Sequence, residues 1–262
     1  MMFLTTRPLW QAGLLLVGLA TLLAMSGPFL VRRRVGLAKL STNNEVAGFK
    51  FATVGVLYAV LLGFAVIVVW EKFSDAENNV AQEAGALATV YRLAAGIRDA
   101  TGTTLRDCLT DYIEATIAED WPAMERGKES PAVTRALGRV YGAVLAYSPG
   151  DRRGAALLAE VLRQLDLVTQ ARRARLVLAS GIVPGVVWLV LFGGAVVTIG
   201  FTFFFGAENL RAQMAMTGAL AVLICSGLLV IIAIDHPFAG SVRVPPEALS
   251  TVLGTFGPAT HP

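Results

Sequence analysis

Long uncharged runs alternate with charged segments along this chain. Each run is at least 20 residues long, and the runs are Leu9–Val31, Phe51–Trp70, Leu176–Ala207 and Ala212–Ile234. Twenty helical residues at about 1.5 Å each cover the roughly 30 Å of a bilayer core. The pattern therefore predicts an all-α membrane protein with four transmembrane helices, two within residues 9–70 and two within residues 176–235.

The first run could instead be a signal peptide. Its 23 residues exceed the apolar core of about 7–15 residues that a signal peptide carries. Three arginines, Arg32, Arg33 and Arg34, follow it directly, as they do after a membrane anchor. Their place beside a span also favours contact with lipid headgroups over nucleic-acid binding.

Small side chains follow one face of the second run. They recur at steps of four, three, four and four residues, at Gly48, Ala52, Gly55, Ala59 and Gly63. Such a stripe lets another helix approach closely, so we expect this span to pack against copies of itself or against its neighbours. No proline follows before Arg92, which predicts one continuous rod from the span into the next segment.

Residues 71–175 form a hydrophilic insert with 14 basic and 15 acidic side chains. Their apolar positions recur at helical spacing, and no stretch alternates at period two, so we expect helices and no sheet. The outgoing helix carries an apolar stripe at Phe73, Val80, Ala84, Leu87, Tyr91 and Ala94. Three further helices are predicted, with N-caps at Thr103, Ser130 and Asp151. A kink is expected at Gly181 and Pro184 in the third span, and residues 236–262 form a short tail.

Arginines at the end of the insert, Arg172, Arg173 and Arg175, leave two interpretations open. They can pair with acids on the outgoing helix, namely Glu71, Asp75, Glu77 and Glu83, or they can anchor to lipid phosphates.

Composition adds to the membrane assignment and argues against an enzyme. The chain is 55% hydrophobic and 16% charged, with a mean hydropathy of +0.62, whereas soluble domains carry about a quarter charged residues. Cys108 and Cys225 form no CxxC or His–Cys motif, so we expect no metal site and no cofactor.

Two acidic patterns invite a chemical interpretation and are weighed against a simpler one. Asp235-His236 precedes Pro237 and lacks a suitable nucleophile, which favours a helix end over a catalytic pair. The acids Glu83, Asp107, Asp111 and Glu114 could suggest a metal site, but a solvated helix face is favoured.

Several motifs resemble the bestrophin-like family of four-span bacterial membrane proteins. They are Asn44–Phe49, Val54–Phe64, Trp70-Glu71, Glu83-Ala84, Tyr91-Arg92, Asp120-Trp121-Pro122 and Asp235–Phe238 with Gly240. True bestrophins are pentameric ion channels whose second span lines the pore and whose helical insert is cytoplasmic. The resemblance implies the same arrangement here, in a bacterial inner membrane. The basic-aromatic motif ahead of span one and the acidic calcium clasp are missing, so calcium gating is not implied.

Two functions remain open on the sequence. In the first, several copies surround an apolar pore with Asn43, Asn44 and Lys50 at one mouth and Thr53, Val56, Val60 and Phe64 along the wall. Lys50, together with Arg32, Arg33 and Arg34, would favour anions, although Glu45 opposes them, and Lys50 could also simply snorkel to lipid headgroups. In the second, a non-conducting sensor or scaffold binds a partner protein through the insert. The expected partners are the bilayer, further copies of the chain and small inorganic ions, and no nucleic acid.

Overall fold

The computed structural model describes residues 9–42 and 44–256, and within these ranges the chain is helical with no strand. The chain divides into two compact units. The membrane unit combines the described residues up to Glu71 with Ile182–Asp235, and the insert unit combines Lys72–Gly181 with the described residues after Asp235. Helix α5, Asn44–Ala94, contributes to both units.

The membrane unit confirms the four predicted spans. Four segments of the described chain are long and apolar enough to cross a bilayer: Leu14–Arg34, Asn44–Ala94, Gly185–Phe204 and Leu210–Ile234. The elements of this unit in chain order are α2 (Leu9–Gly13), the π-helical η1 (Leu14–Leu19), α3 (Ala20–Arg34), α4 (Leu37–Ser41), the first part of α5, α10 (Gly185–Phe201), the 3-10 helix η3 (Thr202–Phe204) and α11 (Leu210–Ile234).

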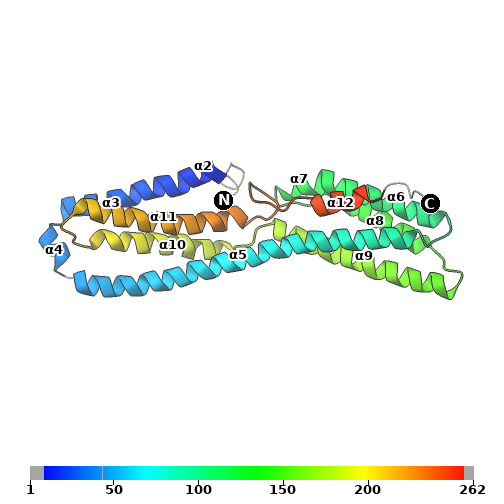
Figure 1. Cartoon of the computed structure of the whole chain (residues 1–262), viewed down its shortest axis with the longest axis horizontal. Helices are drawn as coiled ribbons and strands as arrows, with labels where there is room; N and C mark the ends of the chain where they lie inside the picture. The colour runs from blue at the N-terminus through cyan, green and yellow to red at the C-terminus, as the bar shows by residue number, and fades with distance from the viewer. Residues whose placement is uncertain (1–8, 43, 257–262) are drawn as a thin grey trace. The chain divides into compact units, whose positions relative to one another are not determined.

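Close packing in this unit is strongest between α3 and α11, which lie side by side (Figure 1). Gly27 of α3 meets the ring of Phe203, and a Cβ atom at this position would overlap that ring. Arg32, at the end of α3, donates from its guanidinium to the carbonyl of Ala207 at 2.5 Å and to that of Glu208 at 3.2 Å. These contacts fix the α10–α11 connector against the end of the first span.

The insert unit is built from amphipathic helices of very different lengths together with the second part of α5. They are α6 (Ala100–Ala115), the π-helical η2 (Thr116–Asp120), α7 (Trp121–Met124), α8 (Pro131–Ala146), α9 (Arg152–Ala179) and α12 (Glu247–Gly254). Ser130 and Asp151 cap α8 and α9 as predicted, accepting from the amides of Ala132 at 3.2 Å and Gly154 at 2.6 Å. The predicted cap at Thr103 is wrong, because the N-cap of α6 is Asp99, four residues earlier, and its carboxylate accepts from the Thr101 amide.

The core of this unit follows the predicted stripe of α5. Every stripe residue is buried except Tyr91, which is partly exposed and stacks on Phe256 with 3.7 Å between ring centroids. The segment after α11 also packs into this core: Val244 and Leu249 are buried, and the indole of Trp121 donates to the Val244 carbonyl at 3.1 Å. Residues that the sequence sets apart as a tail are therefore part of the insert unit as far as the chain is described.

The link between α9 and α10 differs from the sequence-based expectation. The predicted kink at Gly181 and Pro184 is wrong, because α9 ends at Ala179 and α10 begins at Gly185. Gly181 adopts a left-handed φ of 103°, which glycine accepts without strain. The first residues of the third uncharged run thus complete α9 instead of starting the span.

The predicted helix end at Asp235-His236 is confirmed, since α11 ends at Ile234. In the membrane unit, the Asp235 carboxylate accepts from the amides of Ile182 at 3.2 Å and Val183 at 2.8 Å. Both amides lie just before α10, where the helix supplies them with no carbonyl partner. Asp235 thereby joins the end of α11 to the start of α10.

Candidate functional site: the exposed face of α5

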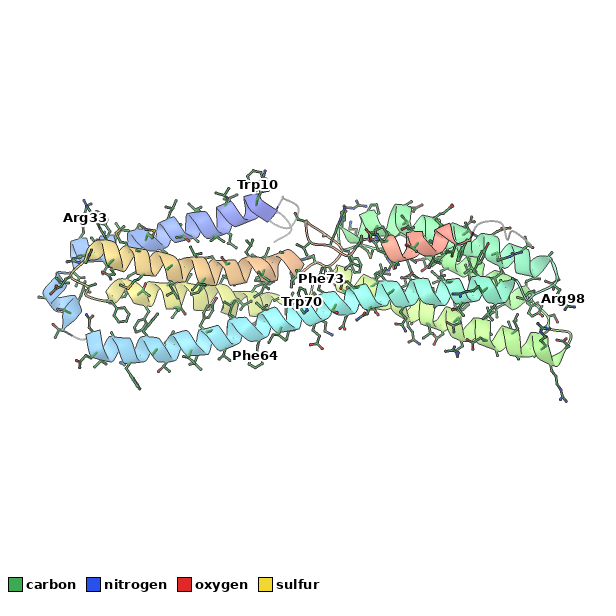
Figure 2. All side chains as sticks on the ribbon, in the orientation of Figure 1. Trp10, Arg33, Phe64, Trp70, Phe73 and Arg98 are labelled. Carbon is green, nitrogen blue, oxygen red and sulfur yellow. The ribbon has the colours of Figure 1, made fainter. Side chains whose placement is uncertain are left out.

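One side of α5 holds the helix to the rest of the membrane unit. Tyr58 is buried, and its hydroxyl donates to the Leu191 carbonyl of α10 at 2.9 Å. The ring of Phe51 packs edge-on against that of Phe205, with 5.6 Å between centroids. Because this side is occupied, the opposite side of α5 faces away from α10 and α11. Phe64 lies at the edge of that free side, where it projects outward in Figure 2 and also borders a groove with Pro184 and Val186.

The predicted wall residues lie on that free side. The side chains of Val56, Val60 and Phe64 are 63%, 52% and 65% exposed, and Ile67, at the next position of the same face, is 61% exposed. Thr53 is also exposed, and its hydroxyl donates to the Phe49 carbonyl of its own helix at 3.3 Å. No described segment covers this apolar stripe, which satisfies the first requirement for a surface shared between subunits.

The predicted mouth residues fall into three different situations. Lys50 is exposed, one turn before Thr53 on the same side of α5. Asn44 is bound inside the chain: its amide nitrogen donates to the Gly206 carbonyl at 2.7 Å, and its amide oxygen accepts from the Gly206 nitrogen at 2.9 Å. We therefore assign Asn44 to positioning the start of α5. Asn43 lies outside the described residues.

The small-residue face borders the apolar stripe. At Gly55 and Gly63 a Cβ atom would meet nothing within 4 Å, and at Gly48 it would meet only the Phe205 ring, at 4.0 Å. Ala52 and Ala59, between these glycines, are exposed. Gly55 and Gly63 thus make no close contact with another helix of the described chain, and their packing against other copies stays a prediction.

The insert unit contains a buried ion cluster that sequence analysis found only in part. Arg175 of α9 is fully buried and pairs with Glu83 of α5, with 2.9 Å between Nε and Oε2. Its guanidinium also lies 3.4 Å from the Asp120 carboxylate, which in turn pairs with Arg172 at 3.1 Å. The Tyr112 hydroxyl donates to Glu83 at 2.6 Å. The pairing of an arginine with Glu83 was one of the two open interpretations, whereas the role of Asp120 was missed.

Burial decides how these groups ionise. Desolvation by burial is the largest single effect and lowers the pKa of Arg175, but Glu83, Tyr112 and Asp120 together outweigh it, so the pKa of Arg175 is raised. Burial, and then the charge of Glu83, raise the pKa of Tyr112 well above its usual range. Both pKa shifts keep Arg175 charged and Tyr112 neutral, so the hydrogen bonds of the cluster persist at neutral pH.

The acidic residues considered for a metal site separate in the structure. Asp107, Asp111 and Glu114 are exposed on α6, as expected for a solvated face. Glu83 is not on a solvated face, and that part of the expectation is wrong because Arg175 and Tyr112 enclose its carboxylate. Within residues 9–42 and 44–256, no three His, Cys, Asp or Glu side chains gather as a metal site would require.

Comparisons with known proteins agree with this architecture. A model of the Bestrophin-like domain matches residues 18–249. A variant of a bacterial bestrophin homologue from Klebsiella pneumoniae superimposes with a TM-score of 0.70 and 14% identity, over 92% of this chain and 97% of that chain. Another structure of a bestrophin homologue from the same organism gives 0.65 and 16%, over 93% and 96%.

A structure described as a membrane protein gives a TM-score of 0.71 and 15% identity, over 92% of this chain and 97% of that chain. A search of curated proteins returned no match. At these identities the structural matches establish a shared fold. Since the domain match covers most of the sequence and the four spans flank a helical insert, this chain belongs to the bestrophin-like family.

Proposed function

We propose that the chain assembles into an oligomeric ion channel, five copies by resemblance to bestrophins, with the exposed face of α5 lining the pore. The observation that carries this proposal is the uncovered stripe Thr53, Val56, Val60 and Phe64 on the free side of α5. A transmembrane helix that only anchored the protein would not need a face of small residues next to an apolar stripe.

The small residues beside the stripe support assembly. Gly55 and Gly63 leave open space where a helix of the next copy can approach to backbone distance. Packing on that face turns the apolar stripe toward the centre of a ring. Rings of valine and phenylalanine side chains can open and close a pathway by wetting and dewetting.

Lys50 gives one mouth of the proposed pore a positive charge. Glu45, which could cancel it, lies five residues earlier and therefore about 140° away around the helix. Lys50 thus favours the entry of anions on its side of the membrane. By the same resemblance, we propose a bacterial inner membrane as the location and a cytoplasmic position for the insert unit.

Recording from purified protein in planar bilayers tests the proposal. We expect discrete currents, and we expect Phe64→Ala to increase the unitary conductance because it widens and wets the narrow stretch. Leu23→Ala is the matched control, since Leu23 is equally exposed but lies on α3. Silence from folded oligomer across a range of voltages would favour the scaffold function instead, and equal effects of both variants would remove α5 from the pore wall.

A further inference from the structure

The exposed stripe of α5 begins and ends with opposite charges. From Lys50 it continues through Thr53, Val56, Val60, Phe64 and Ile67 to Glu71, at steps of three, three, four, four, three and four residues. Each of these seven side chains is exposed. The steps keep to one helical face, and the two charges are separated by about 32 Å along the helix. One cation and one anion therefore mark the two ends of the same apolar surface.

Neither charge is neutralised by the described chain. The side chains of Lys50 and Glu71 form no hydrogen bond or ion pair with any residue in the described ranges. The cation next to Glu71, Lys72, holds Asp75 at 2.8 Å, so those two charges offset one another. Glu71 is thus the uncompensated charge at its end of the stripe.

We propose that this stripe makes the channel a bipolar pathway, with a ring of Lys50 ammonium groups at one mouth, a ring of Glu71 carboxylates at the other, and rectified conduction as the result. This inference rests on the proposed function. It assigns Glu71 as the residue that admits cations at one mouth, whereas Lys50 admits anions at the other.

The direction of rectification follows from the order of the charges. A ring of like charges raises the local counter-ion concentration about tenfold or more. When the Lys50 side is negative, anions enter past Lys50 and cations enter past Glu71, so both ions accumulate in the pore. At the opposite voltage each ion must enter past a like charge, and the pore is depleted. Current is therefore larger when the Lys50 side is negative.

Four proteins recorded as single channels test the proposal, in symmetrical salt for rectification and under a salt gradient for ion selectivity: wild type, Glu71→Lys, Lys50→Glu and the double variant. Wild type should rectify about twofold or more at 0.01–0.1 M salt and lose the effect near 1 M, where the Debye length falls to about 3 Å. Glu71→Lys places cations at both ends, so its current should become symmetrical and anion-selective. Lys50→Glu should become symmetrical and cation-selective. The double variant, with exchanged charges, should rectify again but in the opposite direction, with the larger current when the side of residue 71 is negative.

The double variant separates electrostatics from damage to the fold, because it carries both substitutions and should still rectify, with reversed polarity. Glu77→Lys is a further control: Glu77 is exposed on the same helix, but it lies about 120° from Glu71 around the axis. Glu77→Lys should leave rectification unchanged. Currents that are symmetrical in wild type, or indifferent to Glu71→Lys, would overturn the bipolar pathway and leave the channel standing. Absence of any current from folded oligomer would overturn both.

Discussion

Arg175 and Glu83 form an ion pair that no solvent reaches, with 2.9 Å between Nε of the guanidinium and Oε2 of the carboxylate. The pair ties α9 to α5, the returning and outgoing helices of the insert. Asp120 and Met124 complete the surroundings of the guanidinium, whose Nη1 donates to the Met124 sulfur at 3.2 Å, and the Trp121 ring lies 4.8 Å from its Cζ. The packing of α5, α9 and η2 against one another therefore depends on the Arg175 side chain.

Arg175→Met should destabilise the insert strongly. It leaves the carboxylates of Glu83 and Asp120 buried without their shared cation, and breaking a buried pair by removing one partner typically costs about 3–5 kcal/mol. The readout is the thermal unfolding of the detergent-solubilised protein, followed by circular dichroism.

The matched control is Arg163→Met, which removes the exposed pair between Arg163 and Glu160. There the Arg163 hydrogen bond lowers the pKa of Glu160 to about 2, but water screens both groups. We expect no measurable change in Tm for this variant. An equal decrease in Tm for the two variants would mean that the buried ion pair of Arg175 stabilises the insert no more than the exposed pair of Arg163 does.

Tyr112 should make the protein sensitive to alkaline pH. Burial and the adjacent Glu83 raise the pKa of Tyr112 in the folded state, whereas the unfolded chain ionises near 10. Above that pH the unfolded state loses a proton that the folded state keeps, so the free energy of unfolding falls as pH rises. Its contribution is fully present below pH 10.

Tyr112→Phe removes this titration. The variant should be less stable than wild type at pH 8, because the hydroxyl that donates to Glu83 is lost. The gap in Tm between the two proteins should narrow between pH 10 and 11, as wild type loses stability. A gap that stays constant over this interval would contradict a raised Tyr112 pKa.

Local patterns predicted much of this fold, and tertiary contacts account for what they missed. The four spans and the caps at Ser130 and Asp151 follow from runs and turns that lie within about 30 residues of sequence. Glu83 could not be placed, since its burial depends on Arg175, 92 positions further along the chain. An acid one residue before the stripe residue Ala84 was a signal of partial burial, but the sequence could not decide which of the three arginines would pair with it or whether they would bind lipid phosphates instead.

The break before α10 was missed for a similar reason. Gly181 and Pro184 are compatible with either a kink or a helix end, and the Asp235 carboxylate decides the outcome by binding the amides of Ile182 and Val183. These two amides lie more than 50 positions from Asp235 in sequence. The exposed stripe of α5 was more accessible to sequence reasoning, because its helical spacing is local.

The Phe256 ring should hold α12 in place. It stacks on Tyr91, whose hydroxyl also donates to the Phe256 carbonyl at 2.8 Å. Aromatic pairs contribute about 0.5–1.5 kcal/mol beyond the area they bury. Phe256→Ala should accelerate amide hydrogen exchange across Glu247–Gly254, whereas Tyr91→Phe keeps the stack and should have a smaller effect. Unchanged exchange in Phe256→Ala would show that the ring stack does not hold the helix.

Replacing glycine by leucine on two neighbouring helices should affect two different quantities, the stability of the oligomer for one glycine and the stability of the single chain for the other. Gly55 of α5 faces open space within the chain, whereas a Cβ atom at Gly194 of α10 would overlap the Tyr58 ring. Gly55→Leu should therefore leave the single chain folded and weaken the oligomer by about 1–3 kcal/mol, the typical cost of overpacking a contact. Gly194→Leu should displace Tyr58, remove its hydrogen bond to Leu191 and lower the Tm of the chain itself.

Native mass measurement in detergent gives the subunit number, and thermal unfolding gives the stability of the chain. Gly55→Leu is expected to shift the mass toward smaller species while the helical content at low temperature is retained. If Gly55→Leu keeps the wild-type oligomer through a detergent dilution series, the small-residue face is not the contact between copies. The α5 helices would then have to meet through another surface, and there would be no reason to place the apolar stripe at the centre of a ring.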